Sequence, residues 1–242
     1  MTAASMVVAI VVAAAIDDLS DPRPQPGRAV TSKPHGRNTR KKENMIKQLD
    51  ILLSTLICLS SSVSAFSQHE VELNNRAMEL VRSAPGNRDS LKKAIGLLDS
   101  ATTINPKYQL GYWNKSSILL SLGEFEASIE CQDRILRLRP YRIEAWIVKG
   151  EVLERIGRAD EAKLCYRRAL SLEDSILRTG KAAPSNKIDR AYLMMFTETE
   201  ESGLQELRRL IRRYPGVALY KQMEQFFVGF DRKKFISSLG KN

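Results

Sequence analysis

Histidine and cysteine are scarce in this chain, and each scarcity excludes a class of chemistry. The 242 residues include two histidines, His35 and His69, and three cysteines, Cys58, Cys131 and Cys165. His35 lies before the repeated region described below and His69 lies at its first position, which argues against histidine-based acid–base catalysis, an activated nucleophile or histidine-ligated zinc. Three cysteines do not make a disulfide framework, and the glycines form no phosphate-binding loop. We therefore expect no catalytic residue, no metal site, no cofactor and no enzymatic activity.

The N-terminal region differs in composition from the rest of the chain. Residues 1–44 begin with an alanine- and valine-rich run, and residues 17–44 are rich in proline, arginine, glycine and lysine. Few apolar residues and many charged ones are typical of a disordered segment. We expect Met45 to be the natural initiator, so that residues 1–44 are an extension.

Residues 45–68 have the layout of a bacterial-type secretory signal peptide. Lys47 precedes an apolar run at residues 51–59, and small residues follow at Ala65 and Ser67. The apolar run is too short to span a bilayer, which takes roughly 17–25 residues. We expect cleavage near Ala65 or Ser67 and export to the periplasm or the exterior. In the alternative, residues 51–59 form a short core helix and the protein is cytoplasmic.

Beyond residue 68 the chain repeats itself at a spacing of 34 residues. The segment 109–142 aligns with the segment that begins at Ile143. The matched pairs include Lys115 with Lys149, Leu119 with Leu153, Gly123 with Gly157, Cys131 with Cys165 and Leu136 with Leu170. A fixed period of roughly 20–50 residues indicates stacked supersecondary units, and this period suits a helix–turn–helix pair.

The apolar pattern from residue 69 onward is helical, and no segment alternates as a strand does. We expect four helix pairs in residues 69–217, placed at 69–108, 109–142, 143–176 and 184–217, with a capping helix and tail in residues 218–242. Residues 178–186 are expected to break the register and displace the fourth pair. Ser90 is expected to cap the second helix. The predicted fold class is all-α, an αα-superhelix.

The third unit carries the clearest set of characteristic residues. These are Trp146, Gly150, Gly157, Ala162, Tyr166 and Ala169, and the second unit places Tyr112, Ser116, Gly123, Phe125, Ser128 and Pro140 in the same positions. On these residues the chain resembles the tetratricopeptide repeat family. It departs from the family pattern at Lys149, Leu153 and Asp174. The resemblance implies a right-handed stack with a concave groove lined by the first helix of each unit, and it implies no chemistry.

Helical spacing separates two faces of each first helix. One face, with Tyr112, Ser116 and Leu119, is expected in the core. The neighbouring face lines the groove in the family's geometry, and its residues are the candidate partner-binding set: Trp113, Asn114, Ser117, Leu120, Ile147, Glu151 and Glu154. Trp113 would anchor a peptide there; the alternative is that it packs under the neighbouring unit. A chaperone-tail clamp is rejected because Glu144 and Val148 stand where basic residues are needed.

The chain is basic, with a formal net charge of +10. Its arginines cluster at 134–142 and at 208–213, at the C-terminal ends of predicted helices, where they complement the helix dipole. The predicted function is a non-catalytic scaffold or adaptor that binds a protein or peptide in the groove. The alternative is a basic repeat module that binds an anionic polymer or a membrane surface, and the third option is an enzyme accessory subunit. Nucleic acid is not expected as a partner of an exported protein, no transmembrane span is expected in the mature chain, and the oligomeric state stays open.

Overall fold

The computed structural model describes residues 69–241, and the interpretations that concern residues 1–68 lie outside this part of the chain. All regular structure in the described part is helical, so the predicted all-α fold class is confirmed. The helices are residues 69–83, α3 (Arg88–Ile104), α4 (Gln109–Leu122), α5 (Phe125–Leu138), α6 (Ile143–Arg155), α7 (Ala159–Arg178), α8 (Pro184–Thr197), α9 (Glu200–Arg213), α10 (Ala218–Val228) and α11 (Arg232–Ser238).

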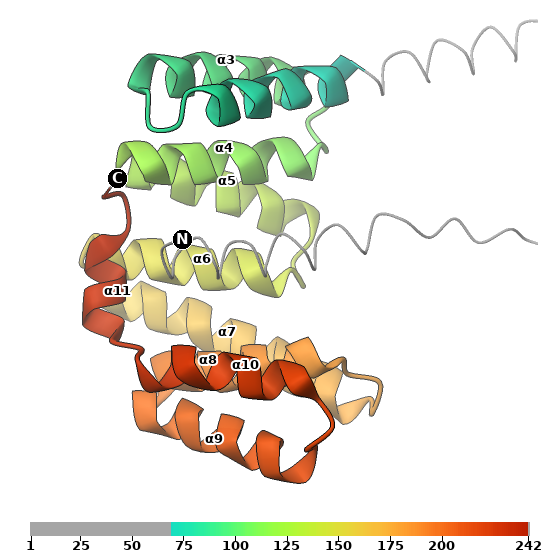
Figure 1. Ribbon diagram of the computed structural model, residues 1–242. Coiled ribbons are helices and arrows are strands. Elements are labelled where there is room, and N and C mark those ends of the chain that lie inside the picture. Colours follow the sequence, from blue (N-terminus) through green and yellow to red (C-terminus); the bar gives the residue numbers. More distant parts are fainter. Residues whose placement is uncertain (1–68, 242) are drawn as a thin grey trace, which may run out of the picture.

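The helices pack in sequence order as a stack of pairs (Figure 1). Within the pairs, α4 packs on α5, α6 on α7 and α8 on α9. Between the pairs, α3 packs on α4, α5 on α6, and α7 on α8. Because the helices from α3 to α10 each pack on their neighbours in sequence, this part of the array is stabilised one interface at a time.

Small residues stand at each crossing within a pair. Gly150 of α6 lies under the ring of Tyr166, and Ala162 of α7 is buried in the same interface. The equivalent residues are Ser116 and Ser128 in the pair α4–α5, and Ala191 and Gly203 in the pair α8–α9; all four are buried. Small side chains allow close approach of two helices, and Gly150 and Ala162 do so for α6 and α7.

An ion pair recurs at each interface between units and explains one departure from the family pattern. Asp99 pairs with Lys115, and Asp133 pairs with Lys149 at 2.5 Å. In both cases the partners are 16 residues apart and join a second helix to the next first helix. Asp133 therefore explains why Lys149 occupies a position at which the family usually has an apolar residue: the two side chains form an ion pair.

The third copy of this ion pair shows where the register changes. Asp174 pairs with Arg190 at 2.8 Å, again 16 residues apart. The extra residues therefore precede Asp174 and lie inside α7, which has 20 residues where α5 has 14. The break expected at residues 178–186 corresponds to the link between Arg178 of α7 and Pro184 of α8, whereas the extra residues lie before it. An insertion of about seven residues adds close to two helical turns. Asp174 therefore still lies on the side of α7 that contacts α8.

The cap of α3 differs from the prediction, and the ends of α4 and α6 show why glycine is needed there. Asn87, not Ser90, caps α3, since its side-chain Oδ1 accepts a hydrogen bond from the Ser90 amide at 2.9 Å. Asn is as good a cap as Ser, and the helix begins one turn earlier. Gly123 ends α4 with φ of 78°, and Gly157 follows α6 with φ of 82°. This left-handed conformation suits glycine and reverses the chain inside each pair.

The C-terminal region closes the stack and then turns back on it. Helix α10 packs on α9 and α8, and its residues Tyr220 and Phe227 are buried. Helix α11 was not expected as a separate element. It packs on α6 and stands across the ends of the stacked helices (Figure 1). Within residues 69–241, no helix is both long and apolar enough to cross a bilayer.

Candidate functional site

The four candidate residues of α4 lie on a face that is partly open. Ser117 is exposed, and Trp113, Asn114 and Leu120 are half-buried. The Asn114 side-chain amide donates a hydrogen bond at 2.7 Å to the Asn74 side-chain oxygen on the helix at residues 69–83. This bond ties neighbouring first helices together along the face.

The sequence left open whether Trp113 is exposed in the groove or packs under the neighbouring unit. In the structure its side chain is half-buried. Its ring packs against a buried cluster that contains Ile135 and Ala145, and Ala145 belongs to the next unit. The remaining part of the side chain is accessible. Tyr112 and Trp146 pack against this same cluster, so these two aromatic residues share one environment, as the repeat alignment requires.

The three candidate residues of α6 are less accessible than a groove residue should be. Ile147 and Glu151 are each only 6% exposed. The Tyr192 hydroxyl of α8 donates a hydrogen bond at 2.8 Å to the Glu151 carboxylate. Glu154 is half-buried and is bound by Tyr166 and Arg232. These positions therefore support the packing of the array, and their role in partner binding stays a prediction.

Glu151 has an unusual electrostatic environment for a surface helix. Burial raises the pKa of its carboxyl to about 7, the negative charge of Glu154 adds to the rise, and the hydrogen bond from Tyr192 opposes it. A carboxyl at this pKa could exchange a proton near neutrality. A substrate could not reach it, however, because α8 covers it. We interpret Glu151 and Tyr192 as a buried polar link between two first helices.

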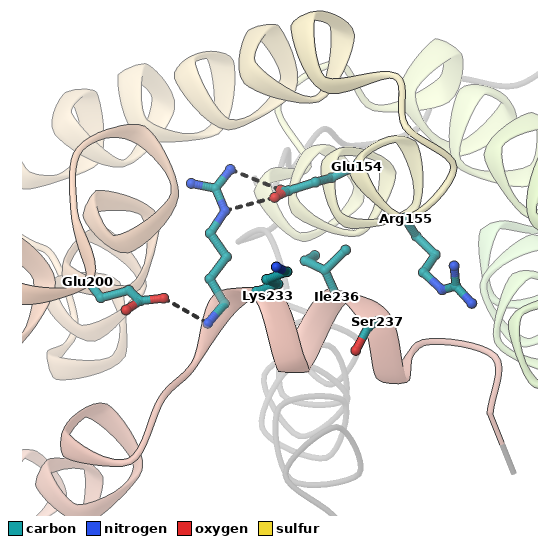
Figure 2. A pocket seen from close by; sticks show the side chains of 7 residues that line it. Glu154, Arg155, Glu200, Lys233, Ile236 and Ser237 are labelled. Atoms are coloured by element: carbon teal, nitrogen blue, oxygen red, sulfur yellow. Dashed lines mark hydrogen bonds and ion pairs between the residues drawn. The ribbon is translucent and has the colours of Figure 1, made fainter.

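A second cluster of contacts, which the sequence did not predict, surrounds Arg232 at the start of α11. Its guanidinium donates two hydrogen bonds to the Glu154 carboxylate, with Nε at 2.9 Å and Nη2 at 3.0 Å. Both residues line a hollow of about 420 Å³. Its lining also includes Glu200 and Ile236 (Figure 2). Arg232 and Glu154 are 78 residues apart, so no local sequence pattern could have joined them.

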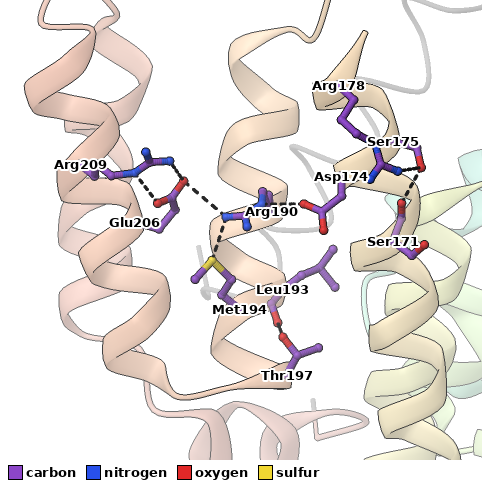
Figure 3. Close-up of polar contacts among 10 residues, drawn as sticks. All are labelled: Ser171, Asp174, Ser175, Arg178, Arg190, Leu193, Met194, Thr197, Glu206 and Arg209. Carbon is purple, nitrogen blue, oxygen red and sulfur yellow. Dashed lines mark hydrogen bonds and ion pairs between the residues drawn. The ribbon is translucent and has the colours of Figure 1, made fainter. Parts of the chain in front are cut away.

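Arg142, Arg208 and Arg209 of the two arginine clusters have acidic partners within the chain. Arg142 pairs with Glu144 at 3.0 Å, and Arg208 pairs with Glu224 at 3.2 Å. Figure 3 shows Arg209 on the Glu206 carboxylate, which in turn reaches Arg190. These contacts favour the interpretation that the clusters serve the helix surface.

Neither metal-binding nor thiol chemistry emerges from the described residues. Among residues 69–241, histidine, cysteine, aspartate and glutamate form no group of three or more that could hold a metal ion. Cys131 and Cys165 are free and buried. Burial raises the pKa of the Cys131 thiol to about 11, so the reactive thiolate is scarce at neutral pH.

Taken together, the stacked helix pairs and the partly open face of first helices define a helical repeat protein. A family model for the tetratricopeptide repeat matches residues 111–142 and 143–175. A tetratricopeptide repeat-containing protein of Methanocaldococcus jannaschii is 30% identical over 87 residues, which are 36% of this chain and 27% of that protein. An uncharacterised protein of the same organism is 31% identical over 62 residues, which are 26% of this chain and 72% of that protein. This chain belongs to the tetratricopeptide repeat family.

The first relative is matched over only part of its length, and the similarity to a solved structure comes with low sequence identity. The matched part spans about a quarter of the length of the first relative, since it covers 27% of it. A solved tetratricopeptide repeat protein from Parabacteroides merdae is 17% identical and has a TM-score of 0.48, with 82% of this chain and 74% of that chain covered.

Proposed function

We propose that this protein is a non-catalytic scaffold that holds a protein or peptide partner on the open part of its first-helix face. We define this surface by Trp113, Asn114 and Ser117 of α4. The observation that carries the proposal is the difference in accessibility between the two halves of the predicted groove. Ser117 is exposed beside a half-buried tryptophan, whereas Ile147 and Glu151 are buried.

The chemistry of this surface suits a peptide. A half-buried tryptophan that already packs against the core offers a large apolar contact at low entropic cost. The Asn114 side chain, fixed by its bond to Asn74, brings amide groups of the kind that bind a peptide backbone beside that contact. Binding on such a preformed face loses little conformational entropy.

The test is affinity capture with a variant that blocks the surface without disturbing the core. Ser117→Arg places a long charged side chain on an exposed position of α4. Ser171→Arg is the matched control, because Ser171 is exposed on α7, the second helix of the next unit. A substitution at Glu151 would be uninformative, since a buried residue that changes charge unfolds the protein.

The expected result is that Ser117→Arg loses the partners that the wild-type protein and Ser171→Arg both retain. Equal recovery of the same partners by both variants would refute the assignment of the surface. The alternative function, binding of an anionic polymer or membrane surface, predicts instead a steep loss of binding with added salt. Because Arg142, Arg208 and Arg209 already have acidic partners in the chain, we favour the scaffold.

We also propose that the protein is exported, on the signal-like composition of residues 45–68. N-terminal sequencing of the protein recovered from cells tests this. A mature chain that begins near Ala65 or Ser67 supports export, and a chain that retains residues 17–44 contradicts it.

A further inference from the structure

Arg232 is bound by groups that come from three different helices. Its guanidinium makes the two hydrogen bonds to Glu154 at the end of α6. Its Nη1 donates to the carbonyl oxygen of Phe196 in α8 at 3.0 Å. Its backbone amide donates to the Glu200 carboxylate of α9 at 2.8 Å. A bidentate carboxylate together with a carbonyl matches the planar donor fork of arginine and does not match the point charge of lysine.

The groups that receive this arginine are held in place by the repeats themselves. The Tyr166 hydroxyl of α7 donates to Glu154 Oε2 at 3.0 Å, which orients the carboxylate. The guanidinium carbon lies 5.0 Å from the centre of the Phe196 ring and 5.8 Å from that of Tyr166. Both distances are within cation–π range. We call the group of Glu154, Tyr166 and Phe196 the arginine socket; none of its members belongs to α11.

The segment that fills the socket is short. Helix α11 has seven residues, of which Ile236 is buried. Half-buried Phe235 and, past the helix, Leu239 pack against the same core cluster. It follows α10 after the link at residues 229–231. Past the helix, the Leu239 carbonyl accepts a hydrogen bond from Arg155 at 3.1 Å. A seven-residue helix with a single fully buried side chain is expected to open more readily than the longer helices of the repeats.

We propose that the arginine socket is a binding site for a short arginine-bearing helix of a partner protein, and that α11 is the intramolecular occupant which such a helix displaces. Charge complementarity fixes the kind of partner, because Glu154 and Glu200 line the hollow together with Arg232 and Lys233. The required helix carries an arginine in its first turn. It carries an aliphatic residue four positions later, as Ile236 follows Arg232, because residues at that spacing share one face.

This inference goes beyond the proposed function, since it concerns the edge of the stack where the turns inside each pair lie. The first-helix face of α4 plays no part in it. The probe is a fluorescent synthetic peptide with the sequence of residues 229–242, and its binding to the full chain is measured by fluorescence anisotropy. Wild-type protein is expected to bind the peptide weakly, because a tethered occupant competes at an effective concentration on the order of millimolar.

Arg232→Ala in the full chain is expected to strengthen binding of the peptide by on the order of 10-fold, because the site then stands open for a larger fraction of the time. Lys234→Ala is the matched control. It removes one positive charge from the same helix at an exposed residue, and it should bind the peptide as weakly as wild type does. Hydrogen exchange of α11 should speed up in Arg232→Ala and stay unchanged in Lys234→Ala.

A second comparison changes only the peptide, so that folding of the protein cannot affect it. Binding to the Arg232→Ala chain should be lost when the peptide itself carries Arg232→Ala, and weakened when it carries Arg232→Lys. The proposal is overturned if the altered peptides bind as well as the original. It is also overturned if Arg232→Ala binds the peptide no better than Lys234→Ala, or if α11 stays fully protected in it. These failures would leave the proposed role of Trp113 and Ser117 untouched.

Discussion

Two glycines at helical positions should respond in opposite ways to the same substitution. Alanine normally stabilises a helix interior by about 0.5–1 kcal/mol relative to glycine. At Gly96 of α3, no atom of the described residues lies within 4 Å of an added Cβ. Gly96→Ala should therefore stabilise the protein by about that amount. At Gly150 of α6, the added Cβ would lie 2.7 Å from Cε1 of Tyr166.

The Tyr166 ring cannot easily move away from that contact. It is fully buried, its hydroxyl is bonded to Glu154, and its centre lies 4.7 Å from that of the Phe196 ring. Overpacking of this kind typically costs about 1–3 kcal/mol, which offsets or exceeds the gain in helix propensity. Gly150→Ala should therefore be less stable than Gly96→Ala by about 1–3 kcal/mol.

Urea denaturation followed by circular dichroism measures this difference, with thermal unfolding as a check. For a domain of this size, about 1 kcal/mol corresponds to a shift of roughly 2–4 °C in the midpoint. Unfolding should also be followed by tryptophan fluorescence, because repeat arrays can unfold in more than one step. If Gly150→Ala proves as stable as Gly96→Ala, the close crossing of α6 and α7 is refuted, and with it the helical register on which the structure of this unit depends.

Two other predictions concern buried or paired charges. Glu173 is 1% exposed, and burial, together with the negative charge of Asp189, raises the pKa of its carboxyl to about 8. The folded state thus holds a proton that the unfolded state releases near its ordinary pKa of about 4.5, so stability should fall as pH rises from about 4.5 to about 8. Glu173→Gln should make that slope shallower in urea midpoints measured at pH 5 to pH 8, and an unchanged slope would contradict this. Lys149→Met removes the ion pair with Asp133 but supplies an apolar side chain, so the change in unfolding free energy should stay within about 1 kcal/mol; a larger loss would mean that the pair is a main support of this interface.

The repeated part of the fold was predictable because local and global signals agree there. Gly123 and Gly157 mark the turns, and small residues such as Gly150 mark the crossings. The spacing between these residues places each helix within a few positions of where it lies. The extension of α7 was harder to place. It adds close to two whole turns, so the periodic pattern continues through Ser175 to Arg178 without a visible break.

The candidate site was less predictable, for a physical reason. Helical spacing shows which residues share a face, but not what covers that face. Glu151 has the spacing of a groove residue, and it is buried because Tyr192 of the next first helix packs over it. Trp113 is partly covered for a similar reason, since Ala145 of the next unit adjoins it. Burial of a first-helix face depends on the neighbouring unit, which sequence periodicity does not describe.

The position of α11 follows from a charge pattern that the helices create for their own stability. Helix α3 has an acidic residue in its first turn and no basic residue in its last. The other second helices have acidic residues in their first turn and basic residues in their last, which complements their dipoles. These are Glu126 and Arg137 in α5, Asp160, Glu161 and Arg178 in α7, and Glu200, Glu201, Arg212 and Arg213 in α9.

Because the units stack in parallel, these local preferences add up along the array. The edge with the turns inside each pair becomes acidic, and the opposite edge becomes basic. At the acidic edge the C-terminal end of a first helix meets the N-terminal end of a second, so their dipoles largely cancel and the carboxylates determine the local potential. A segment that presents Arg232 and Lys233 to that edge is attracted to it and repelled from the other. The placement of acidic and basic residues that stabilises each helix thus also determines which edge of the array binds the C-terminal segment. A partner helix of similar charge would bind at the same edge.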